Sequence, residues 1–144
     1  MLPSAGEGIV ASQNYFQVVD TPSNKRFVAL WEEKYGAIKE PIISEANDTW
    51  NAVMLWAAAA NEAKSVKSDD VIDVLLKGVT IDGPGGPIKS LASNHLMQQI
   101  YLVKGDNNHN FEVIEKYENV MPTYEQSVCN LIENPDTSTQ YTPE

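Results

Sequence analysis

The sequence predicts a small α+β piece, with an N-terminal strand, three helices and then a small antiparallel β segment. Three observations predict it: a β-branched and aromatic opening stretch, apolar residues at helical spacing through the middle, and short apolar runs divided by Gly and Pro after residue 78. With 144 residues, 42% of them hydrophobic and 21% charged, the chain has the size of one domain and enough apolar residues for a core.

The N-terminal part is expected to form a strand followed by a helix. Residues 8–19 are enriched in β-branched and aromatic side chains, which favour an extended backbone with an irregular middle. Thr21 is a suitable helix N-cap, and Pro22 sits where its missing N–H costs nothing. Gly36 is expected to end this first helix.

Two further helices are expected in the middle of the chain. Apolar residues recur at helical spacing over residues 43–64, and we expect Trp50 and Trp56 to pack against neighbouring elements rather than stack on a ligand. Ser68 is expected to cap the third helix, and Gly78 to stop it.

The β segment is expected to consist of short strands. Residues 79–81 read as a strand, and residues 83–87 as a turn, because so many Gly and Pro residues continue neither element. Residues 98–104 and 111–118 read as a hairpin closed by the loop 105–108. We expect the domain to span residues 1–122, and residues 123–144 to form a poorly ordered or docked tail.

Charge and hydropathy exclude several classes of partner. The formal net charge is -10, and nucleic acids and anionic membranes both require clustered Lys and Arg. The longest uncharged stretch, residues 50–61, is shorter than the ~20 apolar residues of a membrane-spanning helix. The first residues show neither the basic start nor the apolar run of a signal peptide.

The sequence offers no catalytic or metal-binding pattern. The two histidines, His95 and His109, have no second ligand at helical or hairpin spacing, and a metal site needs three or four convergent ligands. No nucleophile is paired with a base in a known arrangement. The sequence therefore predicts neither an enzyme, nor a metal ion, nor a cofactor.

Several short motifs occur together in a recognisable order. They are Asn14-Tyr15-Phe16, Asp20-Thr21-Pro22, Lys34-Tyr35-Gly36, Glu45-Ala46, Leu55-Trp56, Ile81-Asp82-Gly83-Pro84, Gly86-Pro87 and Asn94-His95. In this order the chain resembles the C-terminal part of the type I periplasmic solute-binding proteins of ABC transporters. The resemblance is to their urea, short-chain amide and branched-chain amino acid branch.

The resemblance implies a function and a setting. Members of that family are two-lobed α/β proteins that hold a small polar solute between their lobes and deliver it to membrane permease subunits. The resemblance therefore implies a binding protein for urea, a short-chain amide or an amino-acid-like solute, located in the periplasm or otherwise outside the cytoplasm. If only part of the fold is present, we expect exposed faces that pair with a complementing fragment or with a second copy.

Three residues are the candidate ligand contacts that follow from this resemblance. Tyr15 would offer an aromatic face and its hydroxyl, and Asn47 would donate to and accept from an amide. Glu45 would accept hydrogen bonds from an amide or ammonium group. The alternative for Glu45 is a negative charge that interacts with the helix dipole.

Two other functions stay open at this point. The chain could be a ligand-sensing or interaction domain that reuses the same fold. It could also be a truncated remnant that binds no ligand.

Overall fold

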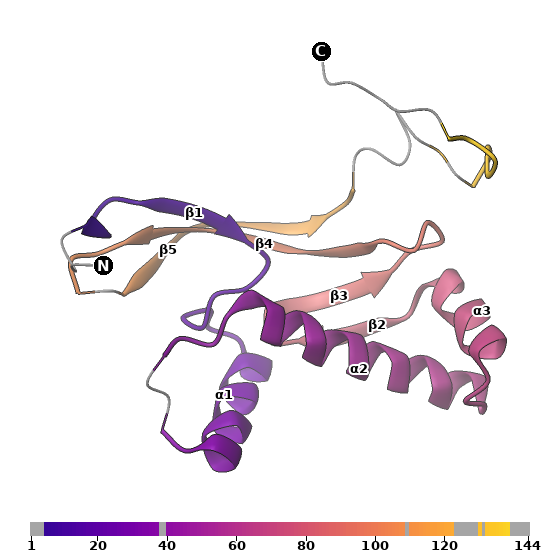
Figure 1. Cartoon of the computed structure of the whole chain (residues 1–144), viewed down its shortest axis with the longest axis horizontal. Coiled ribbons are helices and arrows are strands. Elements are labelled where there is room, and N and C mark those ends of the chain that lie inside the picture. The colour runs from indigo at the N-terminus through magenta and orange to yellow at the C-terminus, as the bar shows by residue number, and fades with distance from the viewer. Residues whose placement is uncertain (1–4, 38–39, 109, 123–129, 131, 139–144) are drawn as a thin grey trace.

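The computed structural model describes residues 5–37, 40–108, 110–122, 130 and 132–138. The helices are α1 (Pro22–Tyr35), α2 (Ser44–Ala63) and α3 (Ser68–Gly78), and the strands are β1 (Val10–Gln13), β2 (Thr80–Gly83), β3 (Gly86–Ser90), β4 (Leu96–Gly105) and β5 (Phe111–Val120). The expected strand, three helices and antiparallel β segment are confirmed in that order. In Figure 1 all three helices lie on one side of the sheet.

Strand β4 is the central strand of a five-stranded antiparallel sheet and pairs with three others. The order is β1-β4-β3-β2, and β5 also pairs with β4. The start of β4 pairs with β3 through Met97 and Lys89, whereas its end pairs with β1 through Lys104 and Val10. Because β4 is long enough to serve both partners, it connects the helix-covered end of the sheet to the β1–β4–β5 ribbon that extends from it (Figure 1).

The core consists of two separate apolar clusters under the helices. One joins α2 and α3 to the sheet, and its buried members are Leu55, Ala59, Val71 and Val79. The other joins the β1–α1 connection to α1 and to the segment before α2, and its buried members are Tyr15, Phe27 and Ile42. Burial of the first cluster removes apolar surface from water and holds α2 and α3 on the sheet, and burial of the second holds α1 against α2 and the β1–α1 connection.

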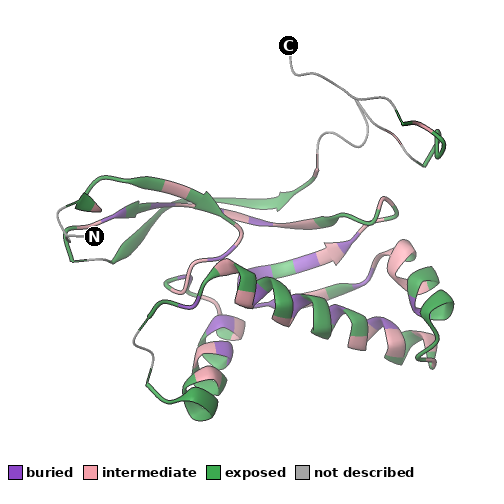
Figure 2. Ribbon diagram, viewed as in Figure 1, coloured by how far each residue is buried: buried purple, intermediate pink, exposed green. Residues whose placement is uncertain are grey.

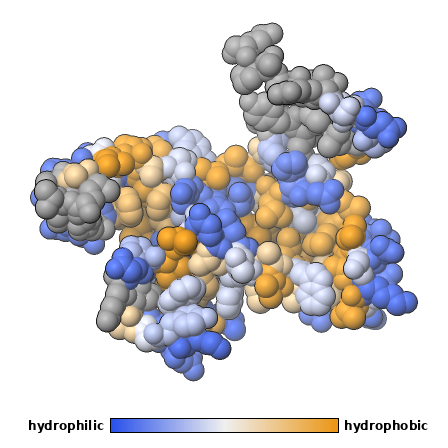
Figure 3. All heavy atoms as spheres, in the orientation of Figure 1, coloured by the Kyte–Doolittle hydropathy of each residue, from blue (hydrophilic) through white to orange (hydrophobic). Residues whose placement is uncertain are grey.

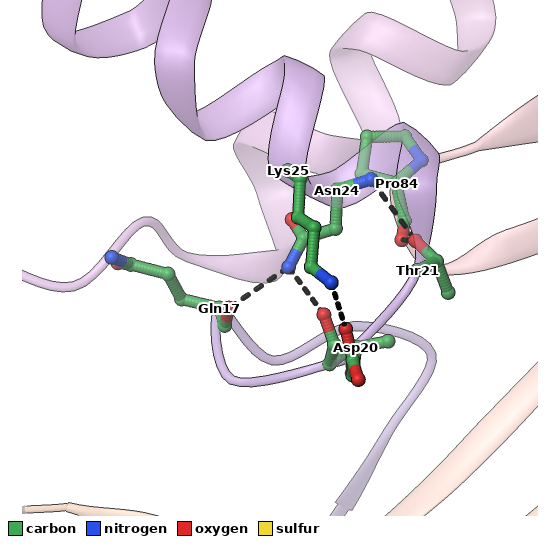
Figure 4. A network of polar contacts seen from close by, with 7 residues as sticks. Gln17, Asp20, Thr21, Asn24, Lys25 and Pro84 are labelled. Carbon is green, nitrogen blue, oxygen red and sulfur yellow. Dashed lines mark hydrogen bonds and ion pairs between the residues drawn. The ribbon is translucent and has the colours of Figure 1, made fainter.

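The N-terminus of α1 is held by a polar network that Figure 4 shows. The Thr21 hydroxyl accepts a hydrogen bond from the Asn24 backbone N–H at 2.9 Å, as expected for an N-cap, and donates one to the Pro84 carbonyl at 2.8 Å. The Asn24 amide donates to the Gln17 and Val19 carbonyls at 2.9 and 2.7 Å. One side of the cap is therefore tied to the β2–β3 turn and the other to the β1–α1 connection.

The Gly- and Pro-rich stretch is a tight β2–β3 turn that packs against several elements. The Gly85 N–H donates to the Asn47 side-chain oxygen at 3.3 Å, and the Gly85 carbonyl accepts from the Tyr101 hydroxyl at 3.0 Å. A Cβ at Gly85 would lie 2.5 Å from the Asn14 carbonyl oxygen. Glycine is required here because the backbones approach more closely than any side chain allows.

Two sequence expectations about these elements are wrong. Residues 83–87 do not form one long turn: Gly83 and Gly86 already pair across a two-residue connection, and β3 runs on to Ser90. Pairing with β4 and burial of Ile88 stabilise this strand despite its Gly and Pro residues. Ser68 is the first residue of α3 rather than its cap, since Lys67 occupies the N-cap position.

The predicted tail falls mostly outside the described residues. Residues 123–129, 131 and 139–144 belong to that part, so the boundary at residue 122 stays a prediction. No helix among the described residues is long and apolar enough to cross a membrane.

Strand β5 is exposed over its whole length, as Figure 2 shows. Apolar side chains also reach the surface on the β1–β4–β5 ribbon, where Figure 3 shows apolar spheres. Those exposed most include Ile9, Val10, Ile114 and Tyr117. A monomeric protein rarely exposes a large contiguous apolar patch unless the patch has a partner or a ligand.

Candidate functional site

A pocket of about 640 Å³ lies where the β1–α1 connection, the N-terminus of α2 and the start of β5 meet. This size is within the range of small-molecule sites. Its lining residues are Gln13, Tyr15, Phe16, Gln17, Val18, Glu40, Pro41, Ile42, Ile43, Ser44, Glu45, Asn110 and Phe111. The pocket combines three aromatic rings, two carboxylates and several side-chain amides.

Glu45 is the predicted contact whose position suits a ligand best. It is exposed, lies in the first turn of α2 and lines the pocket. Its carboxylate accepts a hydrogen bond from the Ser44 hydroxyl at 3.1 Å. No described side chain caps this helix end, so Glu45 interacts with the dipole and keeps acceptor capacity for a ligand.

Tyr15 is one of the residues that line the pocket, but its side chain belongs to the core. Its side chain is fully buried, its ring packs edge-on against Phe27 at a centroid distance of 6.1 Å, and its hydroxyl donates to the Asn24 side-chain oxygen at 2.9 Å. Burial raises the pKa of the Tyr15 hydroxyl far above its ordinary value, so the hydroxyl stays protonated. In this arrangement Tyr15 supports the site from the core.

Asn47 is buried and its amide is engaged inside the protein. Its oxygen accepts from the Gly85 N–H and from the Asn51 amide at 3.2 Å, and its nitrogen donates to the Asp48 carboxylate at 3.1 Å. It does not line the pocket. The structure thus brings Tyr15 and Glu45 to one pocket and places Asn47 in the contact between α2 and the β2–β3 turn.

Sequence reasoning missed the aromatic pair of the pocket. The rings of Phe16 and Phe111 lie 5.6 Å apart at an angle of 51°. Their sequence positions are far apart, and no local pattern brings them together. Phe16 also lies beyond the end of β1 at Gln13, so strand alternation gave no signal for it.

Gln17 was also missed, and it shapes the pocket wall. Its side-chain oxygen accepts a hydrogen bond from the Ile42 backbone N–H at 2.8 Å. This bond joins the β1–α1 connection to the segment that leads into α2. The α2 N-terminus, and Glu45 with it, is thereby held beside Phe16.

The charge of the pocket favours hydrogen-bond donors. Glu40 and Glu45 line it, and no Lys or Arg is among its described lining residues. No cluster of three His, Cys, Asp or Glu that could hold a metal ion occurs in the described ranges. The wall is therefore suited to an amide N–H or an ammonium group.

A second, apolar groove of about 910 Å³ lies between α1 and α2. Phe27, Trp31 and Trp50 line it, with Phe27 5.2 Å from Trp50 and 6.0 Å from Trp31 between ring centroids. Val53 and Tyr35 also line it and are exposed. The groove lacks the convergent polar groups that orient a polar solute.

Comparison with known proteins gives one family and one fold. A family model described as a periplasmic binding protein domain matches residues 1–128. The solute binding protein of an ABC transporter from Rhodopseudomonas palustris BisB5, solved with 3,4-dihydroxybenzoic acid, superimposes with a TM-score of 0.72 and 21% identity, over 85% of this chain and 34% of that chain. The amino acid ABC transporter substrate-binding protein from Pseudomonas fluorescens Pf-5 gives a TM-score of 0.70 and 22% identity, over 88% and 35%.

Among curated proteins, one named limonene hydroxylase from Geobacillus stearothermophilus is 22% identical over 116 residues, which are 80% of this chain and 21% of that protein. This chain spans about a third of the length of the two solved structures and about a fifth of that curated relative. At these identities the likeness to the solved structures shows the fold alone.

Proposed function

Because this chain belongs to the periplasmic binding protein domain family, we propose that it supplies part of the binding site of an ABC-transporter substrate-binding protein. The solute in this proposal is small and polar, and urea, short-chain amides and amino-acid-like molecules are the candidate classes that the test compares. The observation that carries the proposal is the pocket beside the α2 N-terminus, with Glu45 on its wall. That this is the C-terminal portion of the parent fold stays a prediction.

The pocket chemistry supports a solute that carries N–H groups. A carboxylate accepts hydrogen bonds from an amide and pairs with an ammonium group, and Glu45 is exposed where it can do either. Gln13 adds a side-chain amide that both donates and accepts. Such a set fixes the orientation of a polar solute without making or breaking a bond.

The proposal also includes partners and location. A solute held in this way is released to the permease subunits of an ABC transporter. The protein would then work in the periplasm or otherwise outside the cytoplasm. Contacts from the rest of the fold would complete the site, since the chain spans about a third of the solved relatives.

The test is a calorimetric titration of the chain with urea, acetamide, formamide and amino acids. We expect one solute class to bind, and Glu45→Gln to weaken binding about 10-fold or more, because a hydrogen bond to a charged group contributes ~1.5–3 kcal/mol. Glu62→Gln is the matched control, since Glu62 is an exposed carboxylate on the same helix outside the pocket. Equal affinities for the two variants would contradict the assignment of Glu45.

A specific observation favours a second candidate, an interaction domain. The apolar α1–α2 groove exposes Tyr35 and Val53, which is typical of a surface that has a protein partner. Light scattering discriminates between the two functions. A self-associated chain that binds none of the solutes would favour the interaction domain.

A further inference from the structure

The two phenylalanines of the pocket form a wall that a solute as small as urea does not need. Phe16 is half-buried in the β1–α1 connection, and Phe111 opens β5 with 39% of its surface exposed. Their rings lie 5.6 Å apart and are tilted by 51°, so neither stacks flat on the other. Ring surface is thereby left to contact a third group in the same pocket.

The carboxylates of the wall come from other segments than the rings. Glu45 and Ser44 come from the first turn of α2, whereas Phe16 and Phe111 come from the β1–α1 connection and β5. The pocket thus has carboxylates on one part of its wall, and rings with the side-chain amides of Gln17 and Asn110 beside them on another part. A solute that fits both parts has a flat apolar body and an N–H-bearing end.

We infer that the pocket selects an aromatic amide or aromatic amine over urea and short aliphatic amides, with Phe16 and Phe111 as the residues that determine this specificity. The inference rests on the proposed function of the same pocket. A ring placed against the two phenylalanines removes apolar surface from water and gains edge-to-face contacts. Urea and acetamide gain neither.

The charge of the wall sets the polar end of the solute. Glu40 and Glu45 would repel a carboxylate, and no described lining residue is cationic. The solved relative from Rhodopseudomonas palustris BisB5 holds 3,4-dihydroxybenzoic acid. This chain, in contrast, presents acceptors that suit an amide or an ammonium group in place of a carboxylate.

The experiment compares the affinities of benzamide, acetamide, urea and benzoate for the wild-type chain and two variants. Phe111→Leu keeps an apolar side chain but removes the ring, and Tyr117→Leu is the matched control on the same strand, exposed and outside the pocket lining. We expect the wild type to prefer benzamide. Phe111→Leu should lower the benzamide-to-acetamide ratio about 5-fold through loss of the aromatic contact, and the control should leave it unchanged.

A second variant and a second measurement keep the test valid if the Phe111→Leu variant misfolds. Phe16→Leu removes the other ring, and far-UV circular dichroism checks that each variant is folded. On the wild type, saturation-transfer NMR should show the strongest effect on the ring protons of benzamide. Binding of amides with a benzamide-to-acetamide ratio that both ring variants leave unchanged would overturn the inference but keep the proposed function. Preference for benzoate would overturn the charge argument, and no binding of any of the solutes would overturn both proposals.

Discussion

Replacing Tyr15 with Phe separates a core role of this residue from a ligand-binding role. The Tyr15 hydroxyl donates to the Asn24 side-chain oxygen at 2.9 Å, and both side chains are buried. The substitution removes one oxygen atom and keeps the ring that packs on Phe27. The Asn24 nitrogen still bonds two backbone carbonyls, so only its oxygen loses a partner.

The size of the effect follows from that unpaired oxygen. A buried acceptor left without a donor costs ~1–3 kcal/mol. For a chain of this length, 1 kcal/mol corresponds to about 3 °C in the unfolding temperature, so Tyr15→Phe should lower that temperature by about 3–9 °C. Solute affinity should stay within about 2-fold of the wild type, because the buried hydroxyl already donates its hydrogen bond to Asn24.

The assay is thermal unfolding without denaturant, monitored by circular dichroism. A calorimetric titration with the solute that binds measures the affinity. Tyr35→Phe is the control, since 68% of the Tyr35 surface is exposed and loss of that hydroxyl should change little. A Tyr15→Phe variant as stable as the wild type but about 10-fold weaker in solute binding would refute the reasoning and make the hydroxyl a ligand contact.

Three further predictions concern the turns and the cap. Gly85→Ala should destabilise the chain by ~2–4 kcal/mol in chemical denaturation, because its Cβ would lie 2.5 Å from the Asn14 carbonyl oxygen; an unchanged midpoint would contradict the close packing. Thr21→Val should cost ~1–2 kcal/mol by the same measurement, since it removes the α1 cap and the donor to Pro84, and a cost near zero would count against the cap. Hydrogen bonds, first of all from the Asn110 backbone N–H, lower the pKa of Asp106 below its ordinary value of 3.8. The Asp106 carboxylate therefore stabilises the fold above pH 3.8, and this stabilisation decreases as the pH falls toward the lowered pKa. The difference in unfolding temperature between the wild type and Asp106→Asn should therefore shrink below pH 4, and a difference independent of pH would exclude this role.

The sequence by itself determined most of the local elements. Thr21 and Pro22 fixed the start of α1, and Gly36 follows its last residue, because capping and backbone restriction act over one or two residues. The hairpin of β4 and β5 was likewise visible from its two apolar runs. The order of short motifs predicted the family, which the match over residues 1–128 confirms.

Only the tertiary structure decided how those elements form a site. β3 exists because β4 pairs with it, although its own Gly and Pro residues indicate a turn. Tyr15 points into the core because its hydroxyl donates to Asn24 and its ring packs on Phe27 there. Phe16 and Phe111 meet because the β1–α1 connection and the start of β5 line the same pocket. Such contacts join residues far apart in sequence, and their energies depend on packing and burial that no local pattern encodes.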